Sequence, residues 1–302
     1  SGECLRQSRS DGKDRMTVTL TDGALTAKAD AFGAKLVSLR DADGREYIWQ
    51  NKEDFWPDRA GVLFPTSGRL YGGCITYGGK KYDMPLHGFA LTSTFTVAQR
   101  SERGVTFSLT SDKKTLAVYP FPFRLEVTYS LSGARLNVRQ DVYNTGSEEL
   151  CCAPGLHPWF NVPFDEKSGY DDCIVTFPNA TDPKQCIMSD KVLDTGERIA
   201  AGDGFRLAHS LFSRDALVFE GTGDTVKLIC EKTGKTMTIE RYGLPYIGFW
   251  QIAHSHARLL CVEPMSALPG REGVTEDWST RPSAIRVNAG GKASVGMSIS
   301  IG

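Results

Sequence analysis

Four short segments place chemically reactive side chains among glycine, proline and aromatic residues. They span residues 64–70, 84–90, 155–161 and 261–265, and they carry Arg69, His87, His157 and Glu263. Imidazole and carboxylate groups exchange protons near neutral pH once their surroundings have adjusted their pKa values. These segments therefore indicate proton-transfer chemistry, although a single histidine beside glycine or proline is more often a turn or core residue.

Glu263 has the setting of a catalytic base. It follows the apolar run Leu259-Leu260-Cys261-Val262, which predicts a buried strand, and we expect Pro264 to end that strand. The carboxylate then lies where a sheet meets a rim or a cavity. Because a buried carboxylate needs a partner or a raised pKa, Glu263 is a candidate general base.

Several common catalytic motifs are absent from the sequence. There is no GxxxxGK(S/T) loop, no GxGxxG after a strand, no HExxH and no GxSxG. The sequence therefore lacks the signatures of phosphate-binding loops, dinucleotide-binding domains, zinc proteases and serine hydrolases.

The elements that must position these side chains are predicted to be β-strands. Segments of alternating or β-branched composition recur along the chain, separated by Gly, Asp, Asn and Ser turns at intervals of about ten residues. The clearest are residues 17–20, 105–109, 125–129, 136–140, 225–229, 236–240 and 294–301. No segment of four helical turns carries a clean apolar stripe. We therefore expect an all-β fold, a large and mostly antiparallel β-sandwich with at most short helices.

The chain is expected to form one domain. No linker rich in Pro, Gly or Ser divides it, so we predict a single β-sandwich catalytic domain over residues 16–302. Residues 165–215 are irregular and rich in charged and turn-prone residues, which favours loops and surface excursions. Residues 1–15 are polar, without the apolar stretch of a signal peptide, and are expected to be disordered or foreign to the natural chain.

Composition excludes several classes of function. Hydrophobic residues make up 40% and charged residues 24% of the 302 residues, and the formal net charge is −1. Without a positive field the chain is not expected to bind nucleic acid, and without an apolar run of about 20 residues it is not expected to span a membrane. The eight cysteines form no CxxC pair, so we expect reduced thiols and a cytoplasmic protein.

A series of short motifs occurs in a fixed order along the chain, beginning near Leu20. The motifs are Phe32-Gly33-Ala34-Lys35-Leu36-Val37-Ser38-Leu39, Glu46-Tyr47-Ile48-Trp49, Leu63-Phe64-Pro65 with Gly68-Arg69, His87-Gly88-Phe89-Ala90, Tyr119-Pro120-Phe121, Gly155-x-His157-Pro158 and Glu263-Pro264. The ordered series resembles the aldose 1-epimerase (galactose mutarotase) family, and in particular its bacterial LacX-like subgroup. This resemblance implies a large β-supersandwich with a carbohydrate site across one sheet.

Residue by residue, the resemblance implies that His157 is the general acid and Glu263 the general base. Arg69 and His87 correspond to sugar-binding positions. Asp215 is the best counterpart of an aspartate that holds sugar hydroxyls. Aromatic rings can also face the C–H surface of a sugar, and the candidates are Trp250, Trp159 and Phe160.

These residue types suit the interconversion of the α and β anomers of an aldose. The reaction removes the proton of the anomeric hydroxyl, protonates the ring oxygen, rotates the freed aldehyde and reverses both transfers. One carboxylate and one imidazole suffice, so we predict a cofactor-independent isomerase, an aldose 1-epimerase without a metal site. Its partner is a small-molecule sugar, and the protein is expected to be a monomer or a homodimer.

Two alternatives concern the ligand. A catalytically silent carbohydrate-binding protein can have the same fold, although this chain retains both His157 and Glu263. A sugar-phosphate 1-epimerase needs further Arg or Lys side chains for the phosphate, and Arg258 and Arg271 are the arginines that flank Glu263.

Two further alternatives concern the chemistry. If His254 and His256 lie on a strand, they face the same side and can share a metal ion, whereas a polar hairpin turn is the competing interpretation. A glycosidase needs a second carboxylate opposite Glu263, for which Asp215 is the candidate.

Overall fold

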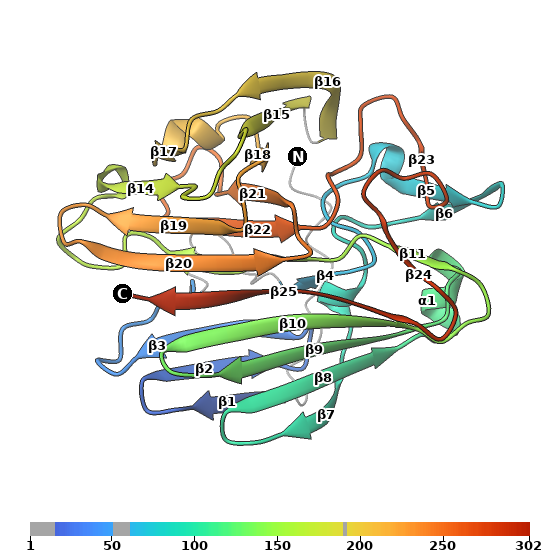
Figure 1. Ribbon diagram of the computed structural model, residues 1–302, viewed down its shortest axis with the longest axis horizontal. Helices are drawn as coiled ribbons and strands as arrows, with labels where there is room; N and C mark the ends of the chain where they lie inside the picture. Colours follow the sequence, from blue (N-terminus) through green and yellow to red (C-terminus); the bar gives the residue numbers. More distant parts are fainter. Residues whose placement is uncertain (1–15, 51–60, 190–191) are drawn as a thin grey trace.

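The computed structural model describes residues 16–50, 61–189 and 192–302, and two large antiparallel sheets dominate them (Figure 1). The first, called here the nine-stranded sheet, has the order β17 (Gly204–Arg206), β14 (Cys173–Thr176), β19 (Thr225–Cys230), β20 (Lys235–Tyr242), β25 (Lys292–Ile301), β10 (Arg135–Asn144), β9 (Phe123–Leu131), β8 (Gly104–Thr110) and β7 (Thr96–Arg100). The second, the eight-stranded sheet, has the order β16 (Val192–Ala200), β15 (Lys184–Ser189), β18 (Leu217–Glu220), β21 (Tyr246–Trp250), β22 (Leu259–Met265), β12 (Gly155–Leu156) and β4 (Val62–Leu63), with β13 (Trp159–Asn161) also paired to β22. The predicted all-β, mostly antiparallel sandwich is confirmed.

Smaller elements accompany the two sheets. They are the three-stranded sheet β1 (Thr17–Thr21), β2 (Leu25–Asp30) and β3 (Lys35–Asp41), the three-stranded sheet β23 (Glu276–Asp277), β5 (Cys74–Tyr77) and β6 (Lys80–Asp83), and the pair β11 (Leu150–Cys152) and β24 (Ile285–Val287). The helices are α1 (Lys113–Val118) and the 3₁₀ turns η1 (Tyr71–Gly73), η2 (Ala90–Thr92), η3 (Tyr170–Asp172) and η4 (His209–Phe212). Within the described ranges, none of these helices has the length and apolar character needed to cross a membrane.

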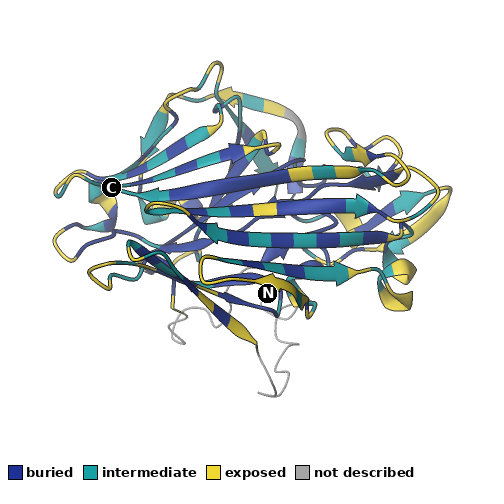
Figure 2. Ribbon diagram, turned by 60° about the horizontal axis from the view of Figure 1, so that its bottom comes forward, coloured by how far each residue is buried: buried dark blue, intermediate teal, exposed yellow. Residues whose placement is uncertain are grey.

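The strands form where apolar and polar residues alternate. Every second residue of β9, from Phe123 to Leu131, is buried, and Figure 2 shows similar alternating bands along neighbouring strands. Because successive side chains of a strand point to opposite faces, this pattern gives the sheet one apolar face. The apolar face can be buried only against another layer.

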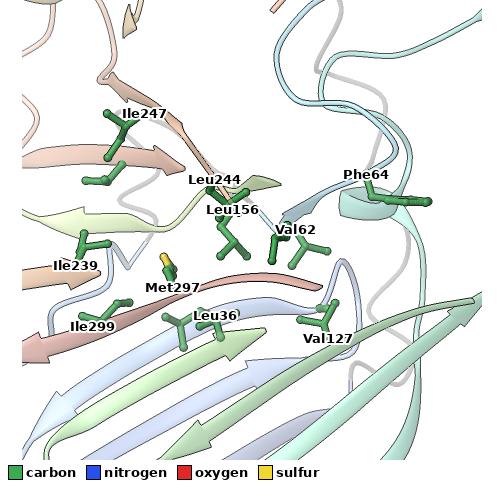
Figure 3. Packing of buried hydrophobic residues seen from close by; sticks show 14 of the residues in the cluster. Leu36, Val62, Phe64, Val127, Leu156, Ile239, Leu244, Ile247, Met297 and Ile299 are labelled. Atoms are coloured by element: carbon green, nitrogen blue, oxygen red, sulfur yellow. The ribbon is translucent and has the colours of Figure 1, made fainter. Parts of the chain in front are cut away.

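The main hydrophobic core lies between the two large sheets. Ile239 and Ile299 reach it from the nine-stranded sheet, and Ile247 and Val262 reach it from the eight-stranded sheet. Figure 3 shows Ile239, Ile299 and Ile247 gathered between the strands that carry them. Full burial of one such side chain contributes roughly 1.5–3 kcal/mol, so this layer holds the eight-stranded sheet in place.

The expectation of loops over residues 165–215 is wrong. Four strands, β14 to β17, lie there; β14 pairs with β19, and β15 pairs with β18. β17 forms one edge of the nine-stranded sheet, and β16 forms one edge of the eight-stranded sheet. Edge strands tolerate charged and turn-prone residues because one side of the strand faces no partner. This tolerance conceals the strand pattern in the sequence.

Pro264 lies inside a strand rather than ending one, because β22 continues past it. On the side of β12 and β13, the N–H groups of Val262 and Ser266 donate to the carbonyl groups of Pro158 and Pro154. Backbone N–H groups of alternate residues point the same way, so the N–H that Pro264 lacks would lie between these two bonds. The ladder therefore loses one bond next to the candidate base.

Two further expectations concern the N-terminal residues and the cysteines. Residues 1–15 lie outside the described residues, so the expectation for that segment and the single-domain boundary stay predictions. The cysteines of the described residues are buried and carry free thiols, and the reduced state stays a prediction.

Candidate active site

Glu263 lies on the face of the eight-stranded sheet that points away from the main core. Along β22, Leu260 and Val262 belong to the main core, whereas Cys261 and Met265 belong to two smaller apolar clusters. Glu263 falls between Cys261 and Met265 on the same face, because side chains alternate along the strand. The sheet therefore presents one carboxylate between two apolar patches.

His157 lies across the strand pair from Glu263. β12 and β13 pair with β22 in one continuous register, in which Gly155 is opposite Met265. In that register His157, between β12 and β13, falls opposite Glu263, and its Nε2 lies 3.2 Å from Oε1 of Glu263. Both side chains are nearly buried, with 7% and 8% of their surface exposed. Backbone pairing thus brings a potential acid and a potential base into contact.

The surroundings of Glu263 favour a strong base. Burial, and secondly the negative charge of Asp215, raise the pKa of Glu263 to about 8. Gly248 of β21 is the cross-strand partner of Glu263, and a Cβ added there would lie 3.3 Å from the Cβ of Glu263. The missing side chain at Gly248 therefore leaves the space that the carboxylate occupies. A carboxylate whose pKa is raised in this way is matched to proton transfer near neutral pH.

Trp159 contacts the opposite side of the His157 ring. Its indole N–H donates to Nδ1 of His157 over 3.1 Å. Burial, followed by the neighbouring His87, holds the pKa of His157 well below its ordinary value. The His157 ring is therefore neutral at neutral pH.

His87 is held by the loop that carries Arg69. The N–H of His87 donates to the carbonyl of Gly68, and the N–H of Gly68 donates to Nδ1 of His87, each over 3.0 Å. The φ of His87 is 63°, a left-handed conformation that is uncommon for residues other than glycine. Its ring lies edge-on to His157 with 5.0 Å between the centroids. Burial and the charge of Arg69 lower the pKa of His87 to about 4.

Gly88 allows this close approach of two loops. Its φ is +76°, and a Cβ there would lie 2.2 Å from the carbonyl oxygen of Phe64. The same carbonyl accepts the N–H groups of Phe89 and Ala90. Segments 64–70 and 84–90, which are separate in the sequence, are therefore joined directly through their backbones.

The other predicted residues, Arg69, Asp215 and Trp250, each lie near a residue of this region. Asp215 precedes β18 and lies near enough for its charge to act on Glu263, and Arg69 lies near enough to act on His87. Trp250 ends β21, and its ring centroid lies 5.8 Å from that of Trp159. The structure therefore places His87, His157 and Glu263 in one group, with the charges of Arg69 and Asp215 acting on it and Trp250 beside Trp159.

Two features of the site differ from the sequence analysis. Arg281, which the sequence did not single out, is buried and donates to Oγ1 of Thr66 over 2.6 Å and to the carbonyl of Leu268 over 3.0 Å. It ties segment 64–70 to the loop after β22, and no local sequence pattern marks it. Phe160 lies in the main core and does not face the site, because it neighbours Trp159 on β13 and points to the opposite side.

His87, His157 and Glu263 form the group of three potential metal ligands in the described part of the chain, with ligand atoms within 4.8 Å of one another. A metal-bound histidine usually donates its other ring N–H to an acceptor. Here Nδ1 of each ring instead accepts an N–H, from Trp159 and from Gly68, which leaves the proton of the neutral ring on Nε2. This pattern fits two hydrogen-bond donors rather than two metal ligands.

His254 and His256 do not lie on a strand. They belong to the turn between β21 and β22, both are exposed, and the φ of His254 is 55°. The ring of His256 lies edge-on to His209 with 5.3 Å between the centroids. The two residues are not part of the metal-capable group found in the described residues. The alternation that would direct both rings to one side is therefore missing, and the interpretation as a polar turn is correct.

The arginines that flank Glu263 in the sequence are engaged elsewhere. Arg258 donates to the carbonyl of Asp165 over 2.7 Å, and Arg271 donates to both carboxylate oxygens of Glu276 over 2.9 and 3.2 Å. These contacts direct part of each guanidinium group toward acceptors of the protein itself.

Similarity to known proteins extends over most of the chain. A family model described as aldose 1-epimerase matches residues 16–199. The chain is 29% identical over 270 residues to the chromosomal protein LacX of Lactococcus lactis subsp. lactis, an alignment that covers 84% of this chain and 88% of that protein.

Solved structures of similar proteins also match the chain. A galactose mutarotase related enzyme from Lactobacillus acidophilus superimposes with a TM-score of 0.89 at 27% identity, covering 95% of this chain and 97% of that chain. A galactose mutarotase-like protein from Lactobacillus casei ATCC 334 gives a TM-score of 0.86 at 28% identity, covering 95% and 100% of the two chains. Together with the match over residues 16–199, these similarities show that the chain belongs to the aldose 1-epimerase family.

Proposed function

We propose that the protein is an aldose 1-epimerase that interconverts the α and β anomers of a free aldose without a cofactor. The observation that carries the proposal is the contact of 3.2 Å between Nε2 of His157 and Oε1 of Glu263 on one face of the eight-stranded sheet. Membership of the family supports a sugar as the class of substrate.

The proposed reaction needs two proton positions close together. Glu263 takes the proton of the anomeric hydroxyl, and His157 gives the proton of Nε2 to the ring oxygen. The bond between the anomeric carbon and the ring oxygen breaks, and a carbonyl forms at that carbon. After rotation of the aldehyde, the same transfers in reverse close the ring as the other anomer. The two oxygens share one carbon, which matches the short separation of the two side chains.

The raised pKa of Glu263 supports its role as the base. A carboxylate of ordinary pKa is a weak base, whereas one with a pKa of about 8 accepts a proton more readily from a hydroxyl group. His157, whose pKa is held well below its ordinary value, does not compete for that proton. The different pKa values thus keep the accepted proton on Glu263 rather than as a positive charge on His157.

The remaining residues are proposed to hold the sugar. Arg69 and His87 are cationic and neutral hydrogen-bond donors beside the pair, Asp215 is an acceptor for hydroxyl groups, and Trp250 offers a ring face to the C–H surface of the sugar. Because Arg258 and Arg271 contact the protein's own acceptors, we propose a free sugar rather than a sugar phosphate.

Polarimetry tests this proposal. Freshly dissolved α-aldoses and one aldose phosphate are followed with and without the protein, and the spontaneous rate is subtracted. We expect acceleration with at least one free aldose and little with the phosphate. Binding of an aldose without any acceleration would favour the silent carbohydrate-binding interpretation, and preference for the phosphate would favour the sugar-phosphate interpretation.

A further inference from the structure

The contact between Trp159 and His157 constrains where the ring proton lies. The two side chains are nearly buried, and the indole N–H of Trp159 donates to Nδ1 of His157 over 3.1 Å. An indole N–H can donate but cannot accept a hydrogen bond, so Nδ1 keeps its lone pair. The proton of the neutral ring is then on Nε2, the atom that lies 3.2 Å from Glu263.

The same contact opposes a positive charge on His157. A cationic ring carries a proton on Nδ1 as well, and that proton would point directly at the N–H of Trp159. The ring would also have to displace this donor in a region where the indole is itself nearly buried. A buried N–H without a partner costs free energy, so the neutral ring is favoured.

Titratable groups around His157 come from several elements. Glu263 lies on β22, His87 follows β6, and Asp215 precedes β18. The charge of Arg69 acts on His87. Nε2 lies 3.2 Å from Glu263, whose pKa of about 8 means that it is largely protonated at neutral pH. The carboxyl group therefore offers little negative charge to stabilise an imidazolium at that pH.

We propose that Trp159 is a positioning residue whose indole N–H holds His157 as the neutral Nε2–H tautomer, so that His157 acts on the sugar as an uncharged proton donor. This inference rests on the proposed function, because it defines the form in which the proposed acid works. A neutral imidazole is known to serve as an electrophile in proton-transfer enzymes.

The protons balance between His157, Glu263 and the sugar. As Nε2 gives its proton to the ring oxygen, the proton that Glu263 has taken from the anomeric hydroxyl passes across the 3.2 Å contact to Nε2. One ring opening thus moves one proton from the anomeric oxygen to the ring oxygen and leaves Glu263 ionised and His157 neutral. No long-lived imidazolate or imidazolium is required.

The alternative is that Trp159 serves only to pack against its neighbours. Its ring belongs to a small apolar cluster with Cys261 and Leu259 and lies beside Trp250. A purely structural role would change stability when Trp159 is replaced, but it would not select a tautomer. The decisive experiment therefore measures the tautomer itself.

The experiment is two-bond ¹H–¹⁵N NMR of the full chain with ¹⁵N-labelled histidine. The protein has five histidines, and the signals of His157 are assigned by their loss in His157→Gln. We expect the wild type to show His157 as the neutral Nε2–H form throughout the neutral range. A wild-type spectrum with the Nδ1–H form or with imidazolium at neutral pH overturns the proposal, whether or not any variant folds.

Trp159→Phe and Trp250→Phe form a matched pair of variants. Each removes one indole from the same cluster, but only Trp159→Phe removes the donor to His157. We expect Trp159→Phe to shift His157 toward the other tautomer or the cation and to lower kcat by about 10- to 100-fold with a smaller change in KM, as for other groups that orient a functional histidine. Trp250→Phe is expected to leave the tautomer unchanged.

The outcomes separate this inference from the proposed function. An unchanged tautomer and pH profile in a folded Trp159→Phe protein contradict the positioning role. If His157 is the Nε2–H tautomer in the wild type and shifts in Trp159→Phe, but no aldose is turned over, the positioning role stands and the proposed activity fails.

Discussion

His157 and Glu263 lie opposite each other because β12 and β13 pair with β22 in one register, which leaves 3.2 Å between Nε2 and Oε1. Backbone hydrogen bonds on both sides of His157 hold this register, through the carbonyl groups of Pro154 and Pro158. The relative position of the two groups therefore depends on strand pairing rather than on a loop. Such rigid placement is what general acid–base catalysis requires.

The pH dependence of activity follows from Glu263. Its pKa of about 8 belongs to the free protein, and the base acts only when it is ionised. We expect kcat/KM to rise about tenfold per pH unit below this pKa and to level off above it. Because the neutral form of His157 is the donor, no loss of activity from an imidazolium is expected in this range. Polarimetry with a blank at each pH measures the profile, and a flat profile contradicts the assignment of the base.

The same pKa predicts a change in stability. The folded-state pKa of Glu263 lies above its ordinary value of 4.5, so between these two values the folded protein binds more protons than the unfolded chain. The free energy of unfolding therefore falls as pH rises through this window. Glu263→Gln cannot ionise and lacks this loss. Its free energy of unfolding relative to that of the wild type should therefore increase by roughly 1–4 kcal/mol from about pH 5 to about pH 9.

Urea unfolding at both pH values measures this gain. Glu148→Gln serves as the control, because Glu148 is exposed and lies on no element of the site. An equal pH dependence for the wild type and Glu263→Gln would show that the carboxyl group is not desolvated.

Gly248→Ala tests the space around the carboxylate. The new Cβ would lie 3.3 Å from Cβ and 3.7 Å from Cδ of Glu263, which forces a small displacement. Since misplacement of a catalytic group by about 1 Å can cost a hundredfold, we expect kcat to fall about 10- to 100-fold. Gly202→Ala is the matched control, because only the carbonyl oxygen of Gly204, at 3.8 Å, lies near its Cβ position. Equal kcat values for the two variants would show that the missing side chain at Gly248 is not needed to position Glu263.

Metal removal is expected to leave turnover unchanged. Nδ1 of His87 and of His157 accepts an N–H, which places a proton on each Nε2 that a metal would have to displace. The test compares the polarimetric rate before and after exhaustive treatment with EDTA, in the wild type and in a His254→Ala, His256→Ala double variant. Loss of activity on chelation and recovery with a divalent cation would instead establish a metal-dependent reaction.

The sequence predicted several interior strands of the nine-stranded sheet, but it missed β14 and β15, which also lie inside the two large sheets. Residues 125–129 and 136–140 alternate because one face is buried, and they fall within β9 and β10. The edge strands β16 and β17 escaped prediction, because a strand with one free side needs no such pattern. The prediction that Pro264 ends the strand was wrong for a related reason. Whether a strand tolerates a missing N–H depends on the hydrogen-bonding groups of the neighbouring strand at that point.

The candidate site was predictable only where residue type carried the chemistry. Glu263 stood out as a carboxylate at the end of a buried apolar run, whereas the role of His157 came from the resemblance to the family. The donor role of Trp159 and the bridging role of Arg281 depend on which distant segments meet in the fold. The interpretation of His254 and His256 as a polar turn was correct, so strand alternation does not apply to them.

The most direct test of the account is the turnover of Glu263→Gln. The amide keeps the shape of the side chain but cannot accept the anomeric proton, so the catalysed rate of mutarotation should fall at least about a hundredfold. Binding of the sugar, measured by calorimetry, should change little, and Glu148→Gln should behave as the wild type. The measurement is kcat by polarimetry on an aldose that the wild type accelerates. A loss of this size with retained binding is the predicted result, and a Glu263→Gln protein with near wild-type kcat would contradict the assignment of Glu263 as the base.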